Sequence, residues 1–457
     1  MTRGAGPAPL PRAAELRRLV ARDMPAARAD LERLVRIPSV AFAGFPDEPL
    51  HRAAEAAADI LRAAGLDDVR MVDVPGSPQA VFGQRTAGPG APTVLLYAHY
   101  DVQPAGDAAD WASPPFEPVE REGRLYGRGA ADDKSGIVVH AAALRTLGAS
   151  VRAGVKVLIE GAEETGEGDL EELVRARPDL AAADAIVICD VGNHALGRPT
   201  LTTSLRGMAK IVVEVRTLSG PVHSGMFGGP APDALLALIG MLATLHDGAG
   251  NVAVEGLGGI EYKGGSYDEP AFRRDAGVLA GVALAGSASI AEQLFARPAI
   301  TVIGIDAPAV DGAANAIVPR ARAVISVRVA PGRDPQAARD AVVRHLQAVA
   351  PWRAVLTFGD AGVGEGFLAG TDGPAYAAAA RALEAAYGRP VSFYGQGGSI
   401  PLVAALHAAA PAAELILWGV EEPRSKVHGP DESVDLAELE RCILAEALFL
   451  AELAAAW

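Results

Sequence analysis

Cysteine is scarce in this sequence. The 457 residues include only Cys189 and Cys442, which stand far apart along the chain. A disulfide framework needs several cysteines, and a zinc site built mainly from thiolates needs more than two, so the count argues against both. Two isolated cysteines suit a reducing compartment, and we therefore expect a cytoplasmic protein.

Basic residues and long apolar runs are also few. Lys and Arg number 41 against 56 Asp and Glu, which gives a formal net charge of −15. Nucleic-acid binding draws on a surplus of basic side chains, so we expect no nucleic acid among the partners. The most apolar run, residues 276–286, is well short of the roughly 20 residues that a membrane span needs. We therefore expect no membrane segment.

The sequence has enough apolar residues for large cores. Half of its residues are hydrophobic, and its length exceeds the size at which one core usually stops growing, which predicts two domains. Short runs rich in Val, Ile and Leu at residues 93–98, 155–159 and 185–189 predict strands. Helical patterns at 136–147 and 169–175 lie between them. This alternation predicts an α/β fold with a mostly parallel sheet.

The pattern changes after residue 206. Strands are predicted at 208–215, 323–329 and 354–358, with helices at 232–245 and 334–349. This order is typical of an inserted α+β, ferredoxin-like domain. We therefore predict a catalytic domain formed by residues 1–205 and 366–457, interrupted by an inserted domain at 206–365.

Polar side chains follow the predicted parallel strands. His99, Glu163, Glu164 and Asp190 each come just after a strand, and in such folds ligands gather at the carboxyl ends of the strands. Asp101 lies two residues beyond His99 and could orient its imidazole. Of the adjacent glutamates, one could bind a metal while the other accepts a proton. Each residue taken alone also fits an ordinary turn or a solvated acidic loop.

Further candidates stand in loops. Asp132 and Asp133 occur in GRGAADDKSG just before a predicted helix, where an acidic pair could simply cap the helix. That loop lacks the glycine and lysine spacing of nucleotide-binding motifs, so we discard nucleotide binding. His428 stands in a polar loop, SKVHGPDES, and His194 competes with it as a metal ligand.

The ordered motifs AHYDVQP, GRGAADDKSG, EGAEETGE, ICD, SLRG, PVHSGMFGG, GGSIP and SKVHGPDE resemble those of the dinuclear metallopeptidases. This family includes carnosinases, cytosolic dipeptidases, carboxypeptidase G and aminoacylases, and the match is closest to the dipeptidase branch. The resemblance implies two metal-ligand groups that share one residue: His99, Asp132 and Asp190 in one, and Asp132, Glu164 and His428 in the other. It also implies a cis peptide bond between Asp132 and Asp133, an orienting role for Asp101 and a general-base role for Glu163.

The same resemblance assigns roles in the inserted domain and in the GGSIP loop. His223 is expected to reach the active site of a partner subunit and to stabilise the oxyanion there, which requires a homodimer formed through a lid domain. Arg328 is expected to grip the carboxylate of the substrate. The other expected substrate contacts are Asn315, Gly397, Gly398 and Ser399.

The expected reaction is metal-dependent hydrolysis of the amide bond in dipeptides or short peptides that end in a free carboxylate. The attacking water is activated by two divalent metal ions and deprotonated by Glu163. A ligand set of carboxylates and imidazoles favours zinc, although manganese or cobalt would also fit. The alternative is an N-acyl or N-carbamoyl amino acid amidohydrolase, because such enzymes share the metal motifs.

Overall fold

The computed structural model describes residues 13–166, 169–398 and 400–456. The chain forms two compact units. The first contains the described residues up to Thr203, then Ala369–Tyr394, and then the described residues from Pro401 onward. The second contains Ser204–Leu368 and the described part of 395–400. The chain therefore leaves the first unit twice, for a long insertion and then for a short one, and returns each time.

The first unit is built on a mixed sheet. Its four central strands run parallel in the order β6 (Gly154–Glu160), β3 (Thr93–His99), β7 (Ala185–Ile188) and β17 (Glu414–Leu417). Antiparallel strands flank them: β1 (Asp68–Val72) and β2 (Ala80–Arg85) beyond β6, and β8 (Thr200–Leu205) beyond β17. Strands β15 (Phe367–Leu368) and β16 (Ser392–Gln396) pair with β8. The predicted α/β class is confirmed, with parallel pairing confined to the centre of the sheet.

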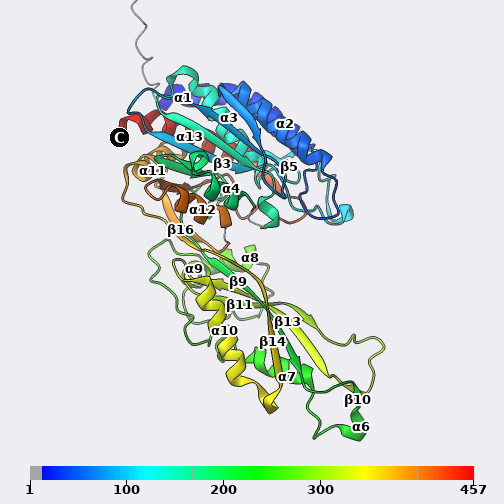
Figure 1. Cartoon of the computed structure of the whole chain (residues 1–457). Coiled ribbons are helices and arrows are strands. Elements are labelled where there is room, and N and C mark those ends of the chain that lie inside the picture. The colour runs from blue at the N-terminus through cyan, green and yellow to red at the C-terminus, as the bar shows by residue number, and fades with distance from the viewer. Residues whose placement is uncertain (1–12, 167–168, 399, 457) are drawn as a thin grey trace, which may run out of the picture. The chain divides into compact units, whose positions relative to one another are not determined.

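Helices cover both faces of this sheet. Six of the seven residues of β3 are buried, which accounts for its unbroken apolar sequence. In Figure 1, α1 (Ala13–Val35), α2 (Glu48–Ala63), α3 (Lys134–Leu147) and α13 (Leu436–Ala456) lie above the sheet. Helices α4 (Asp169–Ala176) and α12 (Pro401–Ala409) lie below it. Helix α11 (Pro374–Tyr387) packs on α13, and α5 (Pro178–Ala181) packs on α4.

A small antiparallel sheet joins two loops of the first unit. Its strands are β4 (Val119–Arg121), β5 (Arg124–Tyr126) and β18 (Ser433–Asp435), in the order β18-β5-β4. The pairing of Ser433 with Tyr126 brings the glycine-rich loop after β5 close to the loop before β18. These two loops carry Asp132 and His428.

The second unit contains an antiparallel sheet covered by two helices. The strand order is β11 (Ala299–Asp306), β13 (Arg320–Val329), β9 (Gly207–Arg216) and β14 (Val355–Gly364). Alternate residues of β9 are buried and pack with α7 (Ala234–Ala243) and α10 (Pro335–Val349) in one hydrophobic core. Along the chain these elements run β-α-β-β-α-β, which is the predicted ferredoxin-like order.

Shorter elements complete the second unit. They are β10 (Val222–His223), α6 (Ser224–Phe227), α8 (Glu269–Asp275), α9 (Ile290–Phe295) and β12 (Ala316–Ile317). In the described part of the chain, none of the helices has both the length and the apolar character that crossing a membrane requires.

Candidate active site

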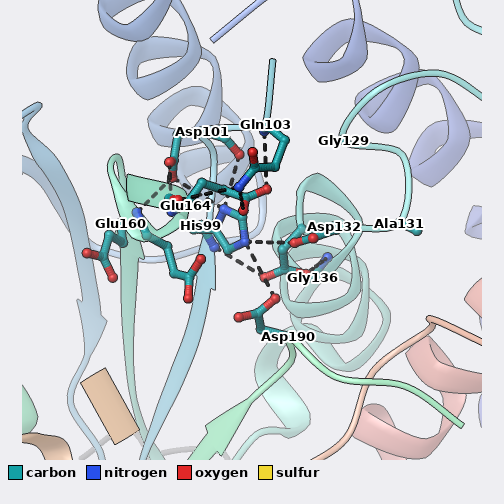
Figure 2. A network of polar contacts seen from close by, with 12 residues as sticks. His99, Asp101, Gln103, Gly129, Ala131, Asp132, Gly136, Glu160, Glu164 and Asp190 are labelled. Carbon is teal, nitrogen blue, oxygen red and sulfur yellow. Dashed lines mark hydrogen bonds and ion pairs between the residues drawn. The ribbon is translucent and has the colours of Figure 1, made fainter. Parts of the chain in front are cut away.

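The predicted site residues of the first unit lie at one edge of its sheet (Figure 2). His99 is the last residue of β3, and Asp190 stands two residues after β7. Glu163 and Glu164 begin a 3₁₀ turn, η3 (Glu163–Thr165), just after β6. Because β6, β3 and β7 are parallel neighbours, their carboxyl ends meet at the same edge. The convergence expected from the strand pattern is therefore present.

Asp132 lies between two groups of potential ligands. Its Oδ1 atom is 3.0 Å from Nε2 of His99, and its Oδ2 atom is 3.0 Å from Nε2 of His428. Nε2 of His99 also lies 3.5 Å from Oδ1 of Asp190, while Nε2 of His428 lies 3.1 Å from Oε2 of Glu164. Each group of three ligand atoms is compact enough to hold one metal ion. The two oxygens of Asp132 thus face different groups.

The neighbouring carboxylates Asp132 and Asp133 have separate surroundings. Asp133 is the N-cap of α3, where its Oδ1 atom accepts a hydrogen bond from the Gly136 N–H at 3.2 Å. Its Oδ2 atom accepts one from the backbone N–H of His99 at 3.2 Å. A Cβ atom on Gly136 would lie only 2.5 Å from Oδ1 of Asp133, so this cap requires glycine. The peptide bond between the two aspartates is cis, as the resemblance implies.

Asp101 contacts both His99 and the glutamate turn. Its Oδ1 atom lies 3.3 Å from Nδ1 of His99, on the side of the ring away from Asp132. Its two oxygens also accept hydrogen bonds from the backbone N–H groups of Glu163 and Glu164, each at 3.1 Å. Asp101 is fully buried, so these contacts fix the imidazole and the turn relative to each other. No feature of the sequence predicted the contact between Asp101 and the glutamate turn.

The electrostatics of the site favour cations. Burial raises the pKa of Glu163 well above its ordinary value, and the negative charge of Asp190 raises it further. Burial also raises the pKa of Asp190 to about 6, against the attraction of His99. Hydrogen bonds to Asp132 and Glu164 raise the pKa of His428 to about 10. Crowded carboxylates that disfavour one another's charge are a setting in which bound metal ions relieve repulsion. The donor set therefore fits divalent metals.

Gln103 is a residue of the site that the sequence interpretation left without a role. Its backbone N–H donates to Oε1 of Glu164 at 3.2 Å, and its side-chain amide donates to Oε2 at 2.8 Å (Figure 2). Gln103 lies inside the HYDVQP motif, and that motif was the one feature of the sequence that could have indicated its place in the site.

His194 stands apart from both ligand groups. Its ring stacks on Tyr394 with the ring centroids 4.2 Å apart, and its Nδ1 atom is 3.0 Å from the hydroxyl of Thr200. Its partners are therefore an aromatic ring and a hydroxyl. Among the described residues, neither of the two groups around Asp132 includes it.

The remaining predicted site residues belong to the second unit. His223 is exposed, and its Nδ1 atom accepts a hydrogen bond from the Gly225 N–H at 3.1 Å. The Asn315 carbonyl accepts from the N–H of Ser224, which places Asn315 beside His223. Arg328 is half-buried on β13, and burial lowers its pKa.

The predicted GGSIP loop is described in part. The Gly397 carbonyl accepts a hydrogen bond from Nε of Arg206 at 3.3 Å, and Gly398 is half-buried beside it. Ser399 lies outside the described residues.

Comparisons with known proteins identify the family of this chain. Residues 95–452 match the profile of "Peptidase family M20/M25/M40". A cysteinylglycine-S-conjugate dipeptidase of Corynebacterium striatum is 43% identical over 397 residues, which cover 85% of this chain and 87% of that protein. The crystal structure of human carnosine dipeptidase 1 superposes with a TM-score of 0.82 at 26% identity, covering 98% of this chain and all of that one.

The fold is shared with a further dipeptidase. Dug1p from Saccharomyces cerevisiae superposes with a TM-score of 0.82 at 22% identity, covering 97% of this chain and 98% of that chain. The profile match extends over the glycine-rich loop, the glutamate turn and the His428 loop. The chain therefore belongs to peptidase family M20/M25/M40 and is a metallopeptidase of its dipeptidase branch.

Proposed function

We propose that this protein hydrolyses dipeptides that end in a free carboxylate, using two divalent metal ions held by the groups around Asp132. The position of Asp132 carries the proposal, because its two oxygens face two separate sets of ligands. His99, Asp132 and Asp190 would hold one ion, and Asp132, Glu164 and His428 the other. Imidazole and carboxylate ligands suit zinc first, with manganese or cobalt as alternatives.

Glu163 is the proposed general base. When bound, the metal ions would polarise the amide carbonyl and make the attacking water more acidic. Glu163 would accept the proton of that water and then donate it to the leaving amine. Two features support the role: its pKa is raised, and its backbone is held by Asp101, so it lies beside the ligands without belonging to either group.

Arg328 is the proposed partner of the substrate carboxylate. Within the described part of the chain, no carboxylate pairs with its half-buried guanidinium, which leaves the planar fork available for an anion. Asn315 and the loop of Gly397, Gly398 and Ser399 are proposed as further contacts to the substrate. The Corynebacterium striatum relative is named for cysteinylglycine S-conjugates, and we propose that this chain accepts the same class of dipeptide.

A homodimer is part of the proposal. We propose that residues 206–365 form an inserted lid and dimerisation domain between 1–205 and 366–457. In the second unit, β11 is an edge strand that exposes Val302, Ile303 and Ile305, and an exposed apolar edge strand is suited to pairing with a second copy. The exposed His223 would then act in the active site of the partner. The two free cysteines, both buried, agree with a cytoplasmic location.

A substrate panel tests this function. The purified protein, loaded in turn with zinc, manganese and cobalt, is assayed with Cys-Gly, S-substituted Cys-Gly, other dipeptides, and N-acetyl and N-carbamoyl amino acids. We expect hydrolysis of the dipeptides, with S-substituted Cys-Gly among the best substrates. Selective hydrolysis of N-acetyl or N-carbamoyl amino acids would contradict the proposal and favour an amidohydrolase.

A further inference from the structure

Glu432 binds the loop that carries Asp132 but belongs to neither ligand group. It stands four residues after His428, and its side chain is completely buried. Its Oε1 atom accepts hydrogen bonds from the backbone N–H groups of Ala131 at 3.0 Å and Asp132 at 3.2 Å. Its Oε2 atom accepts from the N–H of Gly129 at 3.1 Å. One carboxylate thus binds the backbone of the loop that carries Asp132 at three points.

Arg128 extends this contact to His428. Its Nη1 atom donates to Oε2 of Glu432 at 2.7 Å, and its Nη2 atom donates to the backbone carbonyl of His428 at 3.2 Å. The arginine is 1% exposed, so water does not compete for these bonds. The two side chains therefore connect the backbones of Asp132 and His428, which are almost 300 residues apart in the sequence.

The two ligand groups differ in how the fold supports them. In the group of His99, Asp132 and Asp190, His99 ends β3 and Asp190 follows β7, and these two strands are paired. In the other group, His428 lies in a loop with a positive φ of 63°, and its side chain is 55% exposed. The pairing of β5 with β18 brings the two loops together, but neither Asp132 nor His428 lies on a strand. Glu432 and Arg128 make the side-chain contacts that join the backbones of the two residues.

We propose that Glu432 and Arg128 are positioning residues that hold Asp132 and His428 at metal-binding separation, and so support the ion of the group with Glu164. This inference rests on the metal site of the proposed function. Contacts that orient ligands from outside the ligand set typically change metal affinity by roughly 10- to 100-fold when they are removed.

Glu432→Gln tests the proposal, with Glu422→Gln as the matched control. Glu422 stands in the same region of the chain and is 6% exposed, and it forms an ion pair with Nη1 of Arg124 at 2.6 Å. Among the described residues, its side chain contacts Arg124 and the backbone N–H of Arg424, and neither contact involves residues 127–132. Both variants lose a buried negative charge beside an arginine, but only Glu432→Gln alters the Asp132 loop.

Zinc affinity is measured by calorimetry with a competing chelator on folded, metal-stripped protein. We expect Glu432→Gln to weaken the binding of one of two zinc ions by roughly 10- to 100-fold. Binding of the other ion should weaken less, because His99 and Asp190 are held at the ends of paired strands. Glu422→Gln should bind both as wild type does. With saturating zinc, Glu432→Gln should regain kcat with KM unchanged, which a general loss of stability would not produce.

Three results would overturn the proposal: wild-type affinity for both ions in Glu432→Gln, equal weakening of both ions, or the same loss in Glu422→Gln. If Glu432→Gln does not fold, Arg128→Lys is measured in its place and judged by the same criteria. This substitution removes the guanidinium group that donates to the His428 carbonyl. Failure of the proposed function would give a different result. In that case the wild-type protein itself would bind no zinc in this titration.

Discussion

Glu163 and Glu164 show how neighbouring residues of one type can serve different purposes. Both backbone N–H groups bind Asp101, but only the side chain of Glu164 lies within reach of His428. Gln103 holds the Glu164 carboxylate through two hydrogen bonds. The carboxylate of Glu164 therefore belongs to a ligand group, while that of Glu163 lies beside the group.

This difference predicts opposite effects for two equivalent substitutions. Glu163→Gln should keep both metal ions and lower kcat by roughly 10²- to 10⁴-fold, because it removes the proposed proton carrier. Glu164→Gln should lose one metal ion, because it removes a ligand. Metal content and steady-state kinetics on the same preparations check both expectations.

His194→Ala serves as the control, because His194 packs on Tyr394 outside both groups. It should retain the metal content of wild type. Near-normal turnover by Glu163→Gln would remove Glu163 from its proposed role.

At the residue level, the sequence predicted the proposed metal ligands better than the residues that support them. His99, Asp132, Glu164, Asp190 and His428 could be named from motifs, and the structure brings them together. Glu432 and Arg128 could not be given a role, because they act through backbone contacts to residues distant in the sequence. Pairing of β5 with β18 creates these contacts, and no local pattern reports that pairing.

Strand β6 ends in a buried acid with a consequence for stability. Glu160 is its last residue, and it is 7% exposed and accepts a hydrogen bond from the hydroxyl of Tyr97 at 2.7 Å. Burial raises its pKa from 4.5 to about 8. Between these values the folded state keeps a proton that the unfolded state has released. The contribution of Glu160 to the free energy of unfolding is therefore fully present below pH 4.5. It is lost as the pH rises toward 8.

Glu160→Gln should remove this pH dependence, because the amide cannot ionise and can still accept the bond from Tyr97. In wild type, Glu160 should lower the free energy of unfolding by up to about 1.4 kcal/mol per pH unit within this range. Urea unfolding at about pH 5.5 and about pH 7.5 measures the slope. The exposed Glu48, changed to Gln, is the control and should keep the wild-type slope. An unchanged slope in Glu160→Gln would contradict the assignment.

Elements with strong local patterns were predicted best. Residues 93–98 and 155–159 were expected as strands and lie within β3 and β6. The antiparallel flanks of the sheet were not foreseen, because pairing direction is set by chain crossings rather than by residue pattern. The stretch 251–298 carried no usable motif, yet α8 and α9 form within it, each with a side-chain cap from Asp268 or Ser289.

At the scale of the whole molecule, the proposed dimer makes a prediction about mixed subunits. His223→Ala and Glu163→Gln should each be inactive alone. If His223 acts in the partner's site, a mixed dimer has one complete site. It combines Glu163 of the His223→Ala subunit with His223 of the other.

Equal mixing with subunit exchange should therefore restore about a quarter of wild-type activity, because half of the dimers are mixed and each has one working site. Activity is measured after reversible dissociation and reassociation. A mixture that stays as inactive as its components would contradict action in the partner's site.

The metal content per chain tests the central claim most directly. The account predicts two metal ions in wild type, one in His428→Ala, which belongs to a single group, and fewer than one in Asp132→Ala, which belongs to both. Elemental analysis of the dialysed, folded proteins gives these values. A single ion in wild type, or two ions retained by Asp132→Ala, would contradict a site in which Asp132 is shared between two metals.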